Sequence, residues 1–158
     1  MGSSSLFAAR LFFLPTSLAL AACSLDADGV EASIRGELSD KGVDVKSVTC
    51  PDGRPRKAGD TFDCEGETAS GQPFTVKVTQ TEGGTVKWTL VGRVFDTESW
   101  SRELGLRMGL QLDCGKQKLI AVKGTKIVCS WAGKSTELVF SDDEGNIDAD
   151  FKKSFQLE

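Results

Sequence analysis

Four cysteines form two pairs of nearly equal spacing, and this arrangement constrains the fold more than any other feature of the sequence. Cys50 and Cys64 have 13 residues between them, and Cys114 and Cys129 have 14. In both pairs a glycine lies five residues before the second cysteine, which is followed by an apolar stretch, a turn and a final apolar run. Similarity at a fixed period is typical of a duplicated unit.

The first 22 residues have the pattern of a secretory signal peptide. They contain one basic residue, Arg10, and no acid, and an apolar run over residues 11–20 leads to Ala21-Ala22-Cys23. The run is too short to span a bilayer as a helix. We therefore expect export and removal of residues 1–22. The net charge of −4 then becomes −5, because Arg10 is lost.

Leu20-Ala21-Ala22-Cys23 resembles the lipobox of bacterial lipoproteins. The resemblance implies that the Cys23 thiol is diacylglycerated, that the chain is cut before it, and that the lipid attaches the protein to a membrane. N-myristoylation is excluded by Leu6, since that motif requires Ser or Thr there. The remaining alternative is an ordinary signal with a cysteine at the cut. In Gram-negative lipoproteins Asp after the cysteine retains the protein in the inner membrane, so Ser24 favours the outer membrane in such a host.

With Cys23 assigned to the lipid, an even number of cysteines remains. In an exported chain this predicts disulfides. Four cysteines allow three pairings, and spacing alone does not choose among them. If the two repeats share one fold, each closes its own bridge, which predicts Cys50–Cys64 and Cys114–Cys129. Closing loops of this size stabilises each repeat by about 3 kcal/mol in the chain-entropy model.

Each repeat is predicted to begin with a helix. Apolar residues recur at helical spacing in both, and the stripes are Val30, Ile34 and Leu38 in the first helix and Trp100, Leu104 and Met108 in the second. The expected caps are Asp28 and Gly42 for the first helix, and Asp96 or Thr97 and Gly109 for the second. We expect Trp88, Trp100 and Trp131 to lie in the core.

Alternating apolar and polar residues predict the strands. They cover residues 62–65, 74–79 and 86–90 in the first repeat and 127–131, 136–140 and 147–151 in the second. The predicted fold class is α+β, with two tandem units, each an N-terminal helix on a four-stranded antiparallel sheet with one disulfide and one wet face. The expected boundaries are 1–22 for the signal peptide, 23–28 for a lipid-anchored linker, 29–92 for the first unit and 93–158 for a degenerate second unit.

The motifs Val48-Thr49-Cys50-Pro51, Gly59–Cys64 and Thr75–Thr79 resemble the small domain catalogued as domain of unknown function 4333, which occurs on bacterial lipoproteins. The resemblance covers residues 30–90 and is weak in the second half, where Cys114 is not followed by Pro. It implies fold and location, because the family has no assigned activity. The architecture is also similar to that of PepSY-like domains and of secreted β-lactamase inhibitory proteins, in which a concave sheet face grips a protein.

Composition argues against catalysis and nucleic-acid binding. Histidine and tyrosine are absent, which removes the commonest general base and the commonest metal ligand. The chain is mildly acidic and has no polybasic tail, so it lacks a nucleic-acid footprint. Acids crowd one hairpin, but their spacing does not follow the calcium-binding loop and Gly145-Asn146 is typical of a turn; they are Asp142, Asp143, Glu144, Asp148 and Asp150. We expect no cofactor and no metal.

The loops inside both predicted disulfides are basic. Their cations are Arg54, Arg56 and Lys57 in the first loop and Lys116, Lys118, Lys123 and Lys126 in the second. Held by the disulfides, the two loops are predicted to form an anion-binding rim for teichoic or lipid phosphates or an acidic protein. The alternative is that they are solvated loops whose charges keep them out of the core.

The predicted function is that of a lipid-anchored, non-catalytic binding module of the cell envelope. The outer sheet face and the basic loops are the expected contact surface, and the partner is an envelope protein or an anionic polymer. A second hypothesis is inhibition of an exported enzyme, which a concave surface with exposed aromatics would favour. A third is envelope hydrolysis through carboxylates, which requires two acids close together in a pocket.

Overall fold

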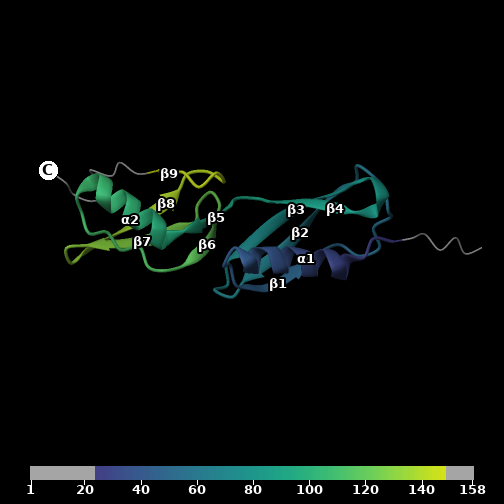
Figure 1. The fold of residues 1–158 in the computed structure, drawn as a ribbon, viewed down its shortest axis with the longest axis horizontal. Helices are drawn as coiled ribbons and strands as arrows, with labels where there is room; N and C mark the ends of the chain where they lie inside the picture. Colours follow the sequence, from purple (N-terminus) through teal and green to yellow (C-terminus); the bar gives the residue numbers. More distant parts are fainter. Residues whose placement is uncertain (1–23, 149–158) are drawn as a thin grey trace, which may run out of the picture.

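A computed structural model describes residues 24–148 of the chain. The predictions for the signal peptide, for Cys23 and for the strand end beyond residue 148 lie outside the described residues. The fold is α+β with two helices, antiparallel sheets and two disulfides, as predicted. Figure 1 shows residues 24–92, the N-terminal half, and residues 93–148, the C-terminal half, arranged end to end.

The N-terminal half is a helix packed on a four-stranded sheet, as predicted for this part of the chain. Its elements are α1 (Ala27–Asp40), β1 (Val45–Thr49), β2 (Thr61–Thr68), β3 (Pro73–Gln80), the short 3-10 turn η1 (Glu82–Gly84) and β4 (Val86–Leu90). The sheet order is β1-β2-β3-β4, and every neighbouring pair is antiparallel. In Figure 1, α1 lies along one face of this sheet.

Helix α1 buries the predicted stripe but begins earlier than expected. Val30, Ile34 and Leu38 are all buried against the sheet. The N-cap is Asp26 rather than Asp28, and its carboxylate accepts a hydrogen bond from the Gly29 N–H at 3.2 Å. Asp28 lies in the first turn, where its negative charge interacts favourably with the positive end of the helix dipole. Asp26 and Asp28 are both acids near the start of the helix, and the Asp26 side chain is the one that caps it.

The C-terminal half contains two separate sheets, so the prediction of one four-stranded sheet is wrong here. Its elements are β5 (Arg93–Asp96), α2 (Thr97–Met108), β6 (Lys118–Ala121), β7 (Lys126–Trp131), β8 (Lys134–Phe140) and β9 (Ile147–Asp148). β5 pairs with β6, and β7, β8 and β9 form a three-stranded sheet. Within residues 24–148, the flank of β7 that would receive a fourth strand carries a single bridge, Asp113–Ser130.

A shortened hairpin explains the loss of this strand. In the N-terminal half β1 pairs with the extension of β2 that follows the cysteine, from Thr49 opposite Glu65 to Val45 opposite Thr68. In the C-terminal half the chain turns back soon after the cysteine, with Trp131 already opposite Lys134. Little strand therefore remains beyond Ser130 for a fourth strand to pair with.

Other hydrogen bonds recur at equivalent places in the two halves. The glycine before the second cysteine donates to a β-strand carbonyl, and that strand residue donates back to the residue after the glycine. The residues are Gly59, Gln80 and Asp60 in the first half and Gly124, Phe140 and Thr125 in the second. The β5–β6 pair, which periodicity did not predict, also has a counterpart in the first half. Val94 lies opposite Ile120 in the second half, and Ser24 forms a bridge to Pro55 in the first. In both halves the first residue of the pair lies three residues before the helix, and the second lies inside the disulfide loop.

The disulfides join Cys50 to Cys64 and Cys114 to Cys129, the pairing that the internal repeat predicts. All four cysteines are buried, and each bridge belongs to a different hydrophobic cluster. The two cores therefore each contain one covalent crosslink between the segment that follows the helix and the strand that contains the second cysteine.

The buried face of α2 is not the predicted stripe. Thr97, Ser101 and Gly105 are its buried residues, while the flanking Trp100, Leu104 and Met108 are half-buried. Close approach explains this choice of small residues. A Cβ on Gly105 would lie 2.6 Å from the Leu110 carbonyl oxygen, so only glycine fits where the chain passes under the helix.

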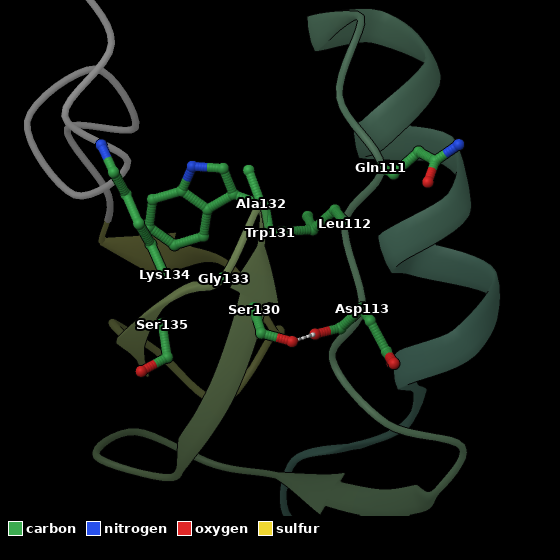
Figure 2. A pocket seen from close by; sticks show the side chains of 9 residues that line it. All are labelled: Gln111, Leu112, Asp113, Ser130, Trp131, Ala132, Gly133, Lys134 and Ser135. Carbon is green, nitrogen blue, oxygen red and sulfur yellow. Dashed lines mark hydrogen bonds between the residues drawn. The ribbon is translucent and has the colours of Figure 1, made fainter.

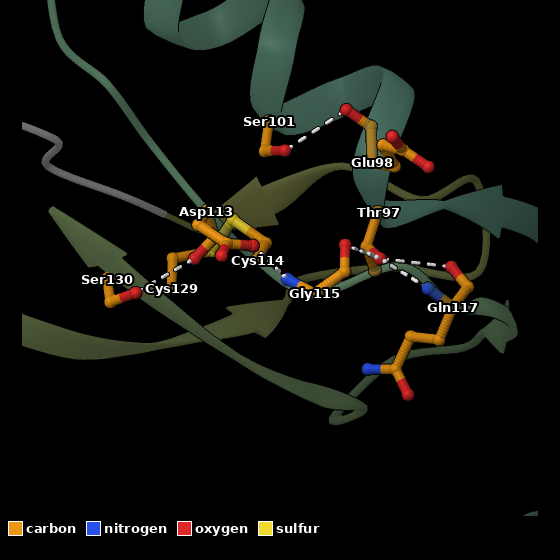
Figure 3. Close-up of a disulfide and its surroundings, with 9 residues drawn as sticks. All are labelled: Thr97, Glu98, Ser101, Asp113, Cys114, Gly115, Gln117, Cys129 and Ser130. Carbon is orange, nitrogen blue, oxygen red and sulfur yellow. Dashed lines mark hydrogen bonds between the residues drawn. A yellow bond between two sulfur atoms is a disulfide. The ribbon is translucent and has the colours of Figure 1, made fainter.

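Thr97 fastens the second disulfide loop to the start of α2, and Figure 3 shows the arrangement. The side chain is fully buried. Its hydroxyl lies 2.9 Å from the Gly115 carbonyl and 3.0 Å from the Gln117 carbonyl, and it accepts the Gln117 N–H at 3.1 Å. One buried hydroxyl therefore binds backbone groups of two residues in the second disulfide loop.

Replacing Thr97 by valine is expected to lower the free energy of unfolding by about 1–3 kcal/mol, because the hydrogen bonds of its hydroxyl to the Gly115 and Gln117 backbone are lost while the shape is kept. Urea denaturation measures the loss. Thr97→Ser is the matched control, since it keeps the hydroxyl and removes only a methyl group. Equal destabilisation by both substitutions would show that packing, and not the hydrogen bonds, holds this loop.

The junction between the halves is formed by β6 and the β2–β3 turn. Ile120 on β6 is fully buried, and its side chain belongs to the hydrophobic cluster of the N-terminal half. The Gln72 side-chain amide pairs with the Ile120 backbone, donating to its carbonyl and accepting its N–H, the latter at 3.3 Å. A residue from inside the second disulfide loop thus completes the first core.

Candidate binding surface

The first basic loop uses one of its predicted cations internally. Arg54 forms an ion pair with Asp60 at 2.6 Å, and its guanidinium carbon lies 5.4 Å from the centre of the Phe62 ring. Arg56 donates to the Ser24 carbonyl at 3.2 Å. Within residues 24–148, Arg56 and Lys57 form no ion pair. These two cations are therefore the ones that the first loop offers to a ligand.

The second basic loop is neutralised more fully. Lys116 lies 3.6 Å from Glu98, and Lys126 lies 2.8 Å from Glu137 across the β7–β8 pair. Lys118 faces Asp96 across the β5–β6 pair. The capping N–H of Ser99 lowers the pKa of Asp96, and the charge of Lys118 lowers it further. Local acids thus balance these lysines. Lys123 is exposed and forms no ion pair within residues 24–148.

The structure does not bring the two basic loops together. The first loop meets β3 at its end, through the hydrogen bond from Gly59 to Gln80. The second meets the chain just before β3 begins, through Gln72 and Ile120. Eight residues of strand separate these points, a distance of about 25 Å at 3.3 Å per residue. The predicted continuous anion-binding rim is therefore not assembled in one molecule.

Beside Arg56 and Lys57 the structure has a small cavity of about 230 Å³, lined also by Ala58, Thr81, Gly83 and Gly84. It is open to solvent. Its lining residue Arg56 connects it to Ser24, the residue that follows Cys23, through the hydrogen bond to the Ser24 carbonyl. Glu82 lies in the same turn and is exposed. The acid offsets part of the positive charge, so this end of the molecule is mixed in charge rather than basic.

The outer face of the first sheet is open, because α1 covers the opposite face. Oppositely charged and polar side chains face each other across its strands. Asp63 lies opposite Lys77, and Thr75 donates to Glu65 at 3.1 Å. Lys46 of β1 pairs with Glu67 at 2.7 Å. The face is a polar surface of alternating charge, and threonines fill the positions between.

A groove runs between α1 and β4, where the helix leaves the edge of the sheet partly uncovered. Its volume is about 460 Å³ and its lining includes Glu37, Lys41, Trp88 and Leu90. The Lys41 ammonium lies 5.4 Å from the centre of the Trp88 ring. Trp88 was predicted to be a core residue, but it is half-buried and forms the apolar floor of this groove.

The other two tryptophans pack in the C-terminal half. Trp131 is buried, as predicted. Trp100 is half-buried, and its ring centre lies 5.7 Å from that of Phe95. None of the three tryptophans is presented as a fully exposed aromatic side chain.

A second groove lies where the fourth strand of the C-terminal sheet is missing. Figure 2 shows it between the Gln111–Asp113 segment and the hairpin around Ala132, with Trp131 and Lys134 beside it. Its volume is about 440 Å³. A third groove of about 360 Å³ lies on the opposite side of the same segment, beside α2.

Two acids, Glu98 and Asp113, line the groove beside α2. Both are exposed. Glu98 contacts Arg102 and Lys116 at 3.7 and 3.6 Å, and Asp113 accepts the Gly115 N–H at 2.8 Å. A general acid of a hydrolase needs an apolar environment that keeps it protonated, and this solvent-facing site does not supply one. No group of three potential metal ligands is found among residues 24–148.

The acidic hairpin is organised as a turn by Asp142. Its Oδ1 accepts the N–H groups of Glu144 and Asn146 at 2.9 and 3.0 Å, and its Oδ2 accepts the Asn146 amide at 2.7 Å. The Asn146 side chain and backbone lower the pKa of Asp142 below its ordinary value of 3.8. The carboxylate is thus occupied by the turn itself.

Replacing Asp142 by asparagine is expected to destabilise the protein at pH 6, and the effect is expected to shrink as the pH falls below about 4. Because the folded pKa is lowered, the stabilisation is present above the unfolded value and disappears as the pH falls through the folded value, that is below about pH 4. Urea midpoints of parent and variant at several pH values measure this convergence. Glu144→Gln is the control, since its side chain forms no hydrogen bond in this turn, and a constant gap at all pH values would contradict the expectation.

Comparison with known protein families gives a match that includes most of the N-terminal half. Residues 8–84 match the family model described as domain of unknown function (DUF4333). This match supports the family predicted from the cysteine and strand motifs, and it ends before the C-terminal half begins. Neither the curated proteins nor the solved structures include a match to the chain. The similarity to PepSY-like domains and β-lactamase inhibitory proteins therefore stays a prediction.

Proposed function

We propose that the chain is a lipid-anchored, non-catalytic binding module of the cell envelope, attached through Cys23. The open outer face of the first sheet is its contact surface. The observation that carries the proposal is a disulfide-linked sheet with one face packed against α1 and the other left as a broad array of charged and hydroxyl side chains. Such a surface suits a polar partner, an envelope protein or an anionic polymer, and the accessible cations Arg56 and Lys57 extend it.

The backbone contacts of Ser24 and Leu25 with the first basic loop fit an anchor at Cys23. Ser24 directly follows Cys23 and forms a bridge to Pro55, and the Leu25 N–H donates to the Arg54 carbonyl at 2.8 Å. Backbone pairing with the first basic loop is therefore present one residue after the proposed lipid site. An anchor at Cys23 places the first basic loop next to the lipid surface, with the C-terminal half at the far end of the molecule.

The recurring backbone hydrogen bonds support two tandem units of common origin. A segment before the helix pairs with the disulfide loop in both halves, and the bridge beside the disulfide, Thr49–Glu65 in the first half, recurs as Asp113–Ser130. We place the boundary near residue 92, and the second unit is degenerate in its fourth strand. The inhibitor hypothesis receives no support, because the tryptophans that would serve as binding hot spots are packed or half-buried.

The anchoring part of the proposal is tested in the producing bacterium. The parent chain is expected in the membrane fraction, with an N-terminal peptide beginning at Cys23 whose mass includes a lipid. Cys23→Ala is expected to remain unlipidated and to leave this fraction, while Ser24→Ala behaves as the parent. A parent protein without lipid on Cys23 would overturn this part.

The binding part is tested by cross-linking intact envelopes and recovering the tagged protein. Lys77→Glu reverses a charge at the centre of the outer face, and it is expected to lose the cross-linked partner. Lys134→Glu makes the same change on the hairpin of the C-terminal half and is expected to retain it. If no protein or glycan exceeds the level of an unanchored control, the binding proposal fails.

A further inference from the structure

Strand β4 forms an open edge of the first sheet. The Val91 N–H donates to the Thr75 carbonyl and the Thr85 carbonyl accepts from Thr81, so these residues direct their backbone groups toward β3. Backbone direction alternates along an antiparallel strand. The N–H and C=O groups of Val86, Trp88 and Leu90 therefore point away from the sheet. Among the described residues no strand pairs with this side of β4.

The opposite edge of the sheet is protected, whereas β4 is not. β1 has a register irregularity between Val45 and Ser47, and bulges of this kind prevent an edge strand from pairing further. β4 pairs with β3 in continuous register from Val86 to Leu90. It contains no proline, and its only charged side chain is Lys87. The edge is thus regular and ready to accept another strand.

The apolar face at this edge is incomplete. Val86, Trp88 and Leu90 pack against the core yet remain half-exposed, because α1 does not extend over them. The groove of about 460 Å³ between α1 and β4 lies beside them. A strand added at β4 would place every second side chain on this face. One added strand would therefore both pair with the open backbone edge and fill the apolar groove.

We propose that β4 pairs antiparallel with β4 of a second copy of this chain, about a two-fold axis at Trp88. Val86 then lies opposite the partner's Leu90, Lys87 opposite the partner's Thr89, and Trp88 opposite the partner's Trp88. The outward-pointing backbone groups meet one another in this register, and the two sheets become one sheet of eight strands.

The sequence of β4 is complementary to itself in this register. Every cross-strand pair on the inner face is apolar, and on the outer face each lysine meets a threonine. Shifting the axis to Lys87 would oppose two lysines, which is destabilising. A two-fold pairing is also the commonest symmetry of homo-oligomers. Attachment to one membrane, which rests on the proposed function, raises the effective concentration of the copies; the pairing itself does not depend on the anchor.

Site-specific disulfide trapping in intact cells tests the register. Lys87 and the partner's Thr89 would form a non-hydrogen-bonded pair with Cα atoms about 4.5 Å apart, within the range of a disulfide. A chain carrying both Lys87→Cys and Thr89→Cys is expected to give a covalent dimer on non-reducing gels. Each single variant alone is expected to give none, and the two single variants expressed together with different tags are expected to give the mixed dimer.

These outcomes decide the proposal. Absence of the dimer in both the double variant and the mixture would overturn it, and so would equal crosslinking by each single variant alone. A crosslinked product with the mass of another protein would show that a foreign strand, and not a second copy, occupies the edge. Loss of lipid from Cys23 with the dimer retained would refute the anchor alone.

A backbone variant keeps the test independent of the added cysteines. Val86→Pro removes one outward N–H without breaking a bond to β3, and Thr85 already has the extended conformation, φ −84° and ψ 163°, that precedes proline. Val86→Ala is the matched control for the lost apolar contacts. In chemical cross-linking of the otherwise unmodified protein, the proline variant is expected to lose the dimer that the alanine variant keeps. Retention by both would contradict strand pairing.

Discussion

Replacing Ile120 by alanine is expected to destabilise the N-terminal half by about 2–5 kcal/mol, although the residue belongs to a strand of the C-terminal half. The side chain is fully buried in the first hydrophobic cluster, so its removal leaves a cavity there. The backbone of Ile120 remains paired with the Gln72 amide. The loss therefore reports packing across the junction rather than the position of β6.

The neighbouring residue supplies a matched control. Leu119 lies on the same strand, but its side chain belongs to the cluster of the C-terminal half. Trp88 is the only tryptophan of the N-terminal half, so replacing Trp100 and Trp131 by phenylalanine makes fluorescence report that half alone. In this background Ile120→Ala is expected to lower the urea midpoint more than Leu119→Ala.

The opposite reporter gives the complementary result. With Trp88 replaced by phenylalanine, fluorescence follows the C-terminal half, and Leu119→Ala is expected to have the larger effect. If Ile120→Ala left the Trp88 signal unchanged, Ile120 would not contribute to the first core. If all changes shifted both signals equally, the two halves would unfold as one cooperative unit.

Local pattern predicted the N-terminal half well, because its strands have one buried and one wet face. Alternation located β2, β3 and β4, and the helical stripe of Val30, Ile34 and Leu38 located α1. The repeat also chose the disulfide pairing that spacing left open. The strands and the helix follow from patterns of neighbouring residues, and the disulfide pairing follows from comparing the two halves. Both can be read directly from the sequence.

Features fixed by tertiary contact were not predictable in this way. Nothing in the period of residues 97–108 shows that small residues face the core, since this depends on the approach of Leu110 to Gly105. The Thr97 hydroxyl and the Gln72 amide bind backbone groups 18 to 48 residues away. Because the β7–β8 hairpin is short, the C-terminal half lacks the fourth strand. No single segment of the sequence indicates this.

The candidate site was predicted less well for an electrostatic reason. The sequence shows how many cations each loop contains, but it does not show which acids pair with them. Arg54, Lys116 and Lys126 each meet an acid that folding brings near, and the length of β3 keeps the loops apart. The open edge of β4 was missed because alternation indicates which face of a strand is buried, but not which strands end the sheet.

Removing the second disulfide by Cys114→Ala and Cys129→Ala together is expected to lower the free energy of unfolding of the C-terminal half by about 3 kcal/mol through loop entropy. A structural effect accompanies it. In the N-terminal half the β1–β2 ladder also ties the segment before Cys50 to the sheet. In the C-terminal half the corresponding Asp113–Ser130 bridge is the single ladder contact described there. The segment from Leu110 to Asp113 therefore depends more on its disulfide.

Hydrogen exchange and unfolding of the two double variants test this difference. The Cys50–Cys64 disulfide closes a loop of nearly the same length as the Cys114–Cys129 disulfide, with a sequence separation of 14 against 15. Removing it by Cys50→Ala with Cys64→Ala therefore gives a matching entropic loss. Any further loss in the Cys114/Cys129 variant then measures the missing strand. We expect faster exchange over residues 110–117 in that variant and little change over β1 in the other. Equal protection of the two segments would mean that the Asp113–Ser130 bridge and the packing under Gly105 replace the fourth strand.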